Sequence, residues 1–135
     1  MSPAPLASIP FVAFALTQLQ TAGAQTLQGG EQVYQQTCVA CHGSGVANAP
    51  KFGDRKAWKP LIAEGQPVLT AHAWVGVRGM PPKGGRADLS LEEFAGAVAF
   101  MSREAGGKWQ DPDARMMEKI RHEEKRRHDS LKHRK

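Results

Sequence analysis

The sequence predicts an all-α domain with long loops and a small apolar core. No segment alternates apolar and polar residues with period two over a convincing length, which argues against strands. Apolar residues recur instead at helical spacing in short segments, and 14 glycines and 9 prolines favour turns between them. The 135 residues suffice for one domain, of which 41% are hydrophobic. A domain with so small a core is usually stabilised by a covalent cross-link or a bound cofactor.

Four segments of the body carry the helical signal. We expect helices over residues 31–38, 57–63 and 69–77, the last stopping at Gly79, and a longer helix starting at Leu91 and ended by Gly106-Gly107. The longer helix has the clearest start, because Ser90 and Glu93 form a capping box and Leu89 and Phe94 occupy the staple positions. One apolar stripe follows along it: Phe94, Ala97, Val98 and Met101.

Charge is spread unevenly along the chain. Residues 1–24 contain no Lys, Arg, Asp or Glu, residues 25–101 carry 7 basic and 6 acidic side chains, and residues 102–135 carry 11 and 7. The tail therefore holds most of the formal charge of +5. A near-neutral body with no basic stripe and no interleaved aromatic residues argues against nucleic-acid binding.

The basic tail, residues 108–135, is predicted to be a charged helical or disordered segment that does not join the core. Apolar residues are sparse after Ile120, and pairs such as Glu123 with Arg127 favour a solvated helix. Solvation alone explains such a charge run. The alternative is that the tail contacts an acidic partner or a membrane surface.

Residues 1–24 predict a signal peptide. The apolar stretch from Leu6 to Leu16 is too short to span a bilayer, and Ala22 and Ala24 fit a cleavage site before Gln25. No Lys or Arg precedes the apolar stretch, which departs from the usual signal, so a disordered or interfacial extension is the alternative. We expect a periplasmic protein, with membrane association if the segment is not cleaved.

The motif that indicates chemistry is Cys38-Val39-Ala40-Cys41-His42, which is the C-x-x-C-H attachment signature of c-type haem. Its two thiols can reach the two vinyl groups of one porphyrin, and the adjacent histidine is presented to the iron. With only two cysteines, a Cys₄ zinc or iron–sulfur site is excluded. A thioredoxin-like pair would need a βαβ context, and a zinc site would need further ligands, for which the body offers only His42 and His72.

The chain resembles the class I monohaem cytochromes c, most closely the small bacterial cytochrome c-five type. The shared motifs occur in the family's order over about residues 29–101: Gly30-Glu31-x-x-Tyr34, Cys38-x-x-Cys41-His42, Ala49-Pro50-x-x-Gly53-Asp54, Trp58, Met80-Pro81-Pro82-Lys83-Gly84-Gly85 and Asp88-Leu89-Ser90. The resemblance implies a haem domain over residues 25–107, with about three core helices around one covalently bound haem c. It also implies that the first and last of these helices cross near Tyr34, Phe94 and Val98.

Met80 is the candidate sixth ligand of the iron. It follows Gly79, which allows close backbone approach, and precedes two prolines that stiffen the loop. The family carries its axial methionine at this place. The alternatives are that Met80 only fills the core, as Met101 does on its helix stripe, and that His72 is the ligand.

Two residues near the haem are assigned by the resemblance. It implies that the Pro50 carbonyl accepts the Nδ1–H of His42, which would fix the imidazole tautomer. It also suggests that Trp58 donates its indole N–H to a haem propionate, although packing explains this tryptophan equally well.

Iron held by His42 and Met80 would have no open position for a substrate, which leaves one-electron transfer as the function. No acid, base or nucleophile constellation is evident in the sequence. We therefore expect an exported electron carrier, not an enzyme, with redox proteins as partners. The alternatives are a haem-bearing subunit of a larger oxidoreductase complex, docked through the basic tail, and a gas-binding haem protein if Met80 does not bind iron.

Overall fold

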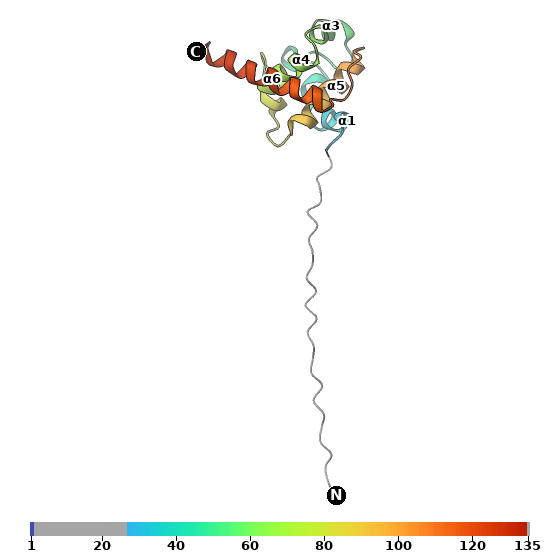
Figure 1. The fold of residues 1–135 in the computed structure, drawn as a ribbon. Helices are drawn as coiled ribbons and strands as arrows, with labels where there is room; N and C mark the ends of the chain where they lie inside the picture. Colours follow the sequence, from blue (N-terminus) through green and yellow to red (C-terminus); the bar gives the residue numbers. More distant parts are fainter. Residues whose placement is uncertain (2–26, 135) are drawn as a thin grey trace.

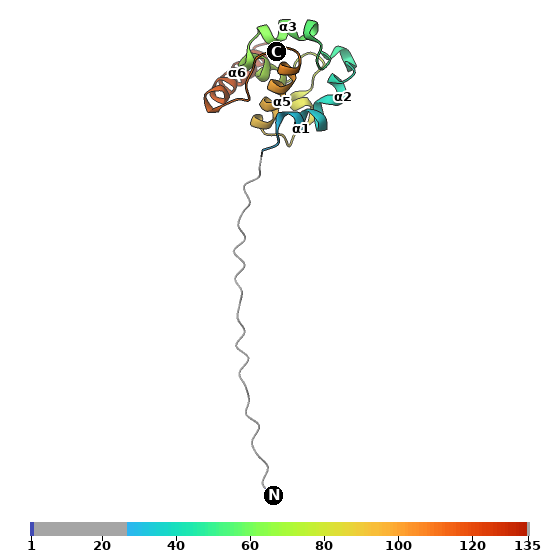
Figure 2. The same cartoon turned by 90° about the vertical axis from the view of Figure 1, so that its right-hand side faces the viewer.

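The computed structural model describes Met1 and residues 27–134, so the predicted signal peptide lies outside the described residues. Within the described part, helices and loops make up the whole fold, apart from one isolated antiparallel bridge between Val77 and Met80. The expected all-α class is therefore confirmed. Figures 1 and 2 show α1, α3, α4 and α5 gathered into one body, with α6 lying along its side.

The first helical segment consists of three continuous pieces. They are α1 (Gly30–Val33), the π-helical η1 (Tyr34–Cys38) and α2 (Val39–His42). The predicted helix over residues 31–38 ends four residues too early, because the backbone stays helical until Gly43 and breaks at Gly45, where φ is 83°. The whole C-x-x-C-H motif therefore lies on helical backbone.

The middle of the chain contains η2 (Val46–Asn48), α3 (Arg55–Ala63), α4 (Gln66–Val75) and η3 (Pro82–Gly85). Helix α3 starts two residues earlier than predicted because the Asp54 carboxylate caps it, accepting from the backbone N–H groups of Lys56 and Ala57 at 3.0 and 3.1 Å. Helix α4 has Pro67 in its first turn and ends at Val75, ahead of the predicted stop, with Gly76 as its C-cap.

Helix α5 (Leu91–Glu104) begins with the predicted capping box. The N–H of Glu93 donates to the Ser90 hydroxyl, and the N–H of Ser90 donates to the Glu93 carboxylate, both at 3.1 Å. The same carboxylate accepts the N–H of Gln28 at 3.1 Å. The N–H groups of Ser90 and then Gln28 hold the pKa of Glu93 below its usual value. The cap of α5 thus also fixes the chain just before α1.

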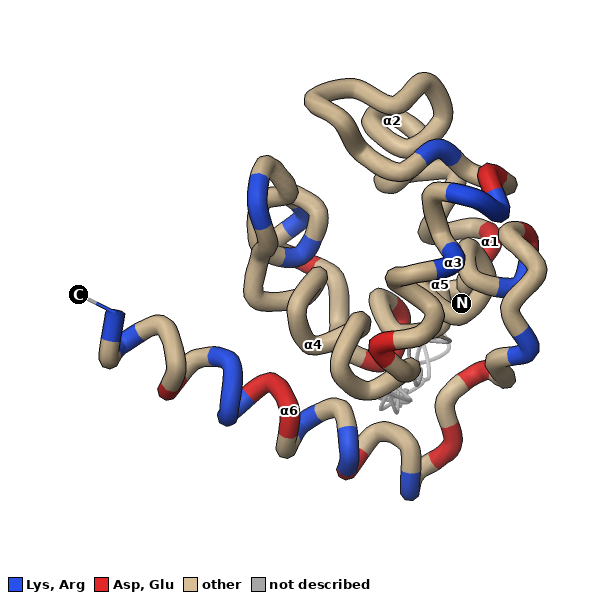
Figure 3. Tube along the Cα trace, turned by 90° about the horizontal axis from the view of Figure 1, so that it is seen from above, with Lys and Arg blue, Asp and Glu red and all other residues tan. Residues whose placement is uncertain are grey.

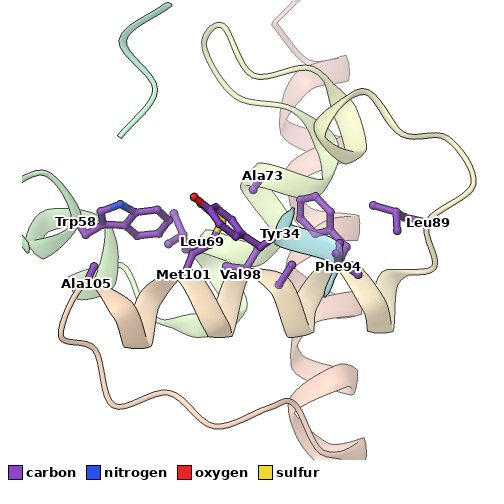
Figure 4. Close-up of a cluster of buried hydrophobic side chains, with 11 residues drawn as sticks. Tyr34, Trp58, Leu69, Ala73, Leu89, Phe94, Val98, Met101 and Ala105 are labelled. Atoms are coloured by element: carbon purple, nitrogen blue, oxygen red, sulfur yellow. The ribbon is translucent and has the colours of Figure 1, made fainter. Parts of the chain in front are cut away.

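Helices α1 and α5 cross at a pair of glycines. A methyl group on Gly30 would lie 2.3 Å from the Gly96 carbonyl oxygen, so the two backbones approach as closely as they do because Gly30 has no side chain. Tyr34, Phe94 and Val98 are buried around this crossing, as the resemblance implies. In Figure 4, one side of α5 directs its side chains toward the residues of the other elements: Tyr34, Trp58, Leu69 and Ala73.

The tail forms α6 (Ala114–Lys132), which packs along α4, so the prediction of a tail that does not join the core is wrong. Met117 and Ile120 are 4% and 0% exposed and form a second apolar cluster with the small residue Ala95 of α5. Two buried residues are too few to show as a periodic pattern in the sequence. They still suffice to hold α6 against the body, because the small side chain of Ala95 allows close contact. Figure 3 shows charges of both signs along α6, whose C-terminal end extends past the body.

The glycine crossing predicts an asymmetric response to two alanine substitutions. Gly30→Ala should lower the free energy of unfolding by about 1–3 kcal/mol, because the new methyl group collides with the α5 backbone. Gly96→Ala is the matched control, since its methyl group would lie 3.7 Å from Gly30 Cα, an ordinary contact, and alanine favours the helix. Guanidinium unfolding measures both, and equal destabilisation would contradict the crossing geometry.

The packing of α6 predicts a large effect of one apolar truncation in the tail. Ile120→Ala should destabilise the protein by about 2–4 kcal/mol, because it empties a fully buried site. Lys119→Ala, an exposed position on the same helix, should change the stability by less than about 0.5 kcal/mol. A solvated tail would instead show no difference between these variants in denaturant unfolding.

Candidate haem-binding site

The two cysteines lie one helical turn apart, in different environments. Cys38 ends η1, is half-buried and packs against the main apolar cluster, whereas Cys41 on α2 is exposed. Both thiols are free. Burial, and then the neighbouring Cys41, raise the pKa of Cys38 to about 11. Cys38 is therefore protonated at neutral pH, which disfavours a thioredoxin-like redox pair, because such pairs depend on a thiolate stabilised at low pKa.

The ring of His42 is buried and oriented by one hydrogen bond. Its Nδ1 lies 2.8 Å from the carbonyl oxygen of Pro50, and the side chain is 9% exposed. Because a carbonyl only accepts, the ring proton resides on Nδ1 and the Nε2 atom keeps its lone pair. This is the arrangement in which an imidazole can bind a metal through Nε2.

Three consecutive residues fix this orientation. Besides the Pro50 carbonyl, the N–H of Phe52 donates to the His42 carbonyl at 2.7 Å, and the Lys51 carbonyl accepts the indole N–H of Trp58 at 2.8 Å. The single N–H of Trp58, which is 4% exposed, is thereby used. Trp58 thus supports the loop that orients His42, and its expected bond to a haem propionate stays a prediction.

The segment around Met80, although distant in the sequence, lies close to the residues just before the C-x-x-C-H motif. Val77 and Met80 exchange two backbone hydrogen bonds, of 3.1 and 2.9 Å, which close a tight turn. A methyl group on Gly84 would lie 3.9 Å from Met80 Cε and 3.7 Å from Thr37 Cγ2, so the Met80 side chain ends close to the residue before Cys38. The φ of Gly84 is +63°, a conformation that suits glycine.

Arg86 holds this loop against η1, and the sequence did not single it out for this role. Its Nη1 donates to Gln36 Oε1 and Thr37 Oγ1, both at 3.2 Å. Its Nε and Nη2 donate to the two carboxylate oxygens of Asp88 at 3.1 and 2.9 Å. The hydrogen bond from Arg86 lowers the pKa of Asp88. Only the Arg86-x-Asp88 spacing is visible locally, whereas the partners on η1 are not.

Aromatic side chains line the interior beside the helical segment. Tyr34 stacks on Phe52 with ring centroids 4.2 Å apart, and Phe100 packs against both rings at 5.8 and 5.6 Å.

His72, the alternative candidate for the sixth ligand, lies on α4 with its Nδ1 3.2 Å from Glu64 Oε2. Between residues 27 and 134, no group of three or more His, Cys, Asp or Glu side chains is arranged to hold a metal ion.

These residues fit a c-type haem. The donor set comprises two free thiols on successive helical turns, an imidazole with an available Nε2 lone pair, and a methionine thioether on a stiff loop. Cys38 and Met80 both pack against the same apolar and aromatic cluster, as suits a macrocycle that is mostly hydrocarbon.

Comparison with known proteins decides the family. The family model described as "Cytochrome C oxidase, cbb3-type, subunit III" matches residues 25–101, more than half of the chain. The chain is a small monohaem class I cytochrome c. Cytochrome c5 of Azotobacter vinelandii is 43% identical over 77 residues, covering 56% of this chain and 93% of the relative. This cytochrome is also 38% identical to cytochrome c-555 of Chlorobaculum tepidum over 98 residues, covering 70% of this chain and 91% of that protein.

Solved structures agree with this family. A cytochrome c from the electron transfer complex of nitrite reductase with cytochrome c has a TM-score of 0.54 and 47% identity, covering 56% of this chain and 93% of that chain. The mono-haem ferrocytochrome c of Shewanella putrefaciens has a TM-score of 0.52 and 38% identity, covering 57% and 95%. This cytochrome accordingly carries one covalently bound haem c. Among the described helices, none is both long and apolar enough to cross a membrane.

Proposed function

We propose that this cytochrome is an exported one-electron carrier whose iron is held by His42 and Met80. The observation that carries the proposal is the Nδ1 hydrogen bond of His42 to Pro50, which leaves Nε2 free for a metal. Met80 is the matching candidate for the second ligand because its loop is fixed by the bridge to Val77 and its side chain ends near Thr37, the residue before Cys38. With both residues bound, the iron has no position for a substrate.

The protein's own residues have separate tasks in this function. Cys38 and Cys41 hold the group covalently, and Pro50 keeps the His42 ring in one tautomer and plane. When bound, the haem supplies a one-electron couple. The neutral thioether of Met80 favours the reduced state and raises the reduction potential. The apolar cluster against which Cys38 and Met80 pack limits water and structural change between the two oxidation states.

We further propose that its partners are other redox proteins. The solved neighbour comes from an electron transfer complex with nitrite reductase, which supports protein docking as the general mode. Val39 and Val46, 37% and 52% exposed, flank exposed Cys41 in the sequence and offer apolar contact near the point of haem attachment. A transient contact at this surface would bring the haem close enough to the cofactor of a redox partner for electron transfer.

A second candidate is a haem-bearing subunit of an oxidoreductase complex. The description of the matching family model, an oxidase subunit, favours it. In that case the charged face of α6 would contact the larger complex. Purification from the native membrane separates the two: a carrier is recovered free of other subunits, whereas a subunit remains with its complex in mild detergent.

Covalent attachment and export can be tested together by intact mass measurement. Protein from cells competent in haem attachment should have the mass of residues 25–135 plus one haem, because the predicted cleavage precedes Gln25 and each thiol adds across one vinyl group. Cys41→Ala should yield much less stably attached haem, since a single thioether remains. Recovery of apoprotein alone would contradict attachment, and retention of Met1 would contradict cleavage.

Removal of the Met80 side chain tests the sixth ligand. Met80→Ala should lower the reduction potential, by on the order of 0.1–0.2 V within the range of about 0.8 V that axial ligands span. It should also allow the ferrous protein to bind carbon monoxide, because a coordination position opens. His72→Ala is the control and should match the wild type. If instead only His72→Ala opened the iron, Met80 would be the wrong residue.

A further inference from the structure

Helix α6 is joined to the end of α4 by one partly buried hydrogen bond. The indole N–H of Trp74, near the end of α4, donates to Oε1 of Glu124 at 3.0 Å. The Glu124 side chain is only 28% exposed, so the acceptor is a partly shielded carboxylate, and such charge-assisted bonds are stronger than neutral ones. Glu124 lies well beyond residue 101, where the match to the family model ends.

The Trp74 ring in turn contacts the loop that carries Met80. The Lys83 Nζ atom lies 4.6 Å from the ring centroid, a cation–π contact between α4 and η3. Trp74 also packs edge-on against Phe94, with ring centroids 5.3 Å apart. A methyl group on Gly84 would be 4.0 Å from Phe94 Cε2 and 3.9 Å from Met80 Cε. Phe94 and the end of the Met80 side chain therefore both lie beside Gly84, and Trp74 and Met80 pack against the apolar cluster that contains Phe94.

Both ends of the loop that carries Met80 lie next to the Trp74 indole. At one end, α4 stops at Val75, directly after Trp74, and Val77 then forms the bridge to Met80. At the other end, Lys83 lies over the indole. A rotation of the indole would therefore displace both flanks of Met80. Without an acceptor for its N–H, the half-buried indole would gain by turning toward water, since an unmet donor is costly.

We propose that Glu124 is a positioning residue for Met80: by fixing the Trp74 ring, it holds the 76–85 loop so that the thioether remains on the iron. This inference rests on the proposed ligation by Met80. Helix α6 then has a role at the haem site, although it contributes no ligand to the iron. The role also gives a purpose to the carboxylate of Glu124, which accepts a hydrogen bond from another helix.

The test measures how readily an added ligand displaces Met80 from ferric iron. Imidazole binds only when the thioether has left, so its apparent affinity rises as the loop is loosened. Glu124→Ala and Trp74→Phe should each bind imidazole about 3- to 10-fold more tightly than the wild type, the range expected for loss of one hydrogen bond. Glu124→Gln retains an oxygen acceptor and should remain within about twofold of the wild type.

A matched control is available one residue away. Glu123 is similarly shielded, at 21% exposed, but pairs with Arg126 rather than with Trp74, so Glu123→Ala should leave imidazole affinity unchanged. The double variant of Glu124→Ala with Trp74→Phe should resemble either single variant, because both remove the same bond. Thermal unfolding, followed in parallel, identifies any variant whose fold is destabilised. Glu124→Gln should unfold at the wild-type temperature, because it keeps an oxygen acceptor for Trp74.

Wild-type affinity in folded Glu124→Ala and Trp74→Phe would overturn the proposal. If Glu124→Ala does not fold with haem, unchanged affinity in Trp74→Phe alone overturns it. Met80→Ala separates this failure from failure of the ligand assignment. If it binds imidazole far more tightly than the wild type, Met80 is the ligand and only the role of Glu124 is in question. If it does not, the proposed ligation is itself wrong.

Discussion

The close approach of α1 to α5 at Gly30 is the constraint on which the site depends. Because α1, η1 and α2 are continuous, the position of α1 against α5 also sets where the two thiols and the imidazole lie. The Glu93 carboxylate strengthens this arrangement, since it caps α5 and also accepts the N–H of Gln28 just before α1. One small contact between backbones thus determines the placement of the cofactor donors.

Two loops complete the site, and each is held to this helical segment by polar contacts. Residues 50–52 bind both the ring and the backbone of His42, and Trp58 supports them from α3. On the other side, Arg86 links the loop after Met80 to Gln36 and Thr37 of η1. The irregular backbone of both loops is therefore determined by hydrogen bonds to one rigid element.

Local signals in the sequence were sufficient for much of this structure. The capping box at Ser90 placed the start of α5, and the C-x-x-C-H spacing gave the candidate haem donors, because both patterns depend on residues close together in the chain. The contacts that were missed join residues far apart: Trp74 with Glu124 are 50 positions apart, and Arg86 with Thr37 are 49. Trp58 could be chosen as important, but the acceptor of its N–H depends on tertiary structure.

The π-helical turn at Tyr34–Cys38 has a consequence for how insertions and deletions would act on this protein. A π turn holds one residue more than an α turn, so each residue after it lies about 100° behind its position in an uninterrupted α-helix. The face that meets α5 and the face that carries Cys41 and His42 are thereby set independently. Loss of one residue between Tyr34 and Cys38 would let the π turn relax to an α turn and leave Cys41 and His42 on the same face relative to α1, whereas an added residue would turn these side chains away from the interior.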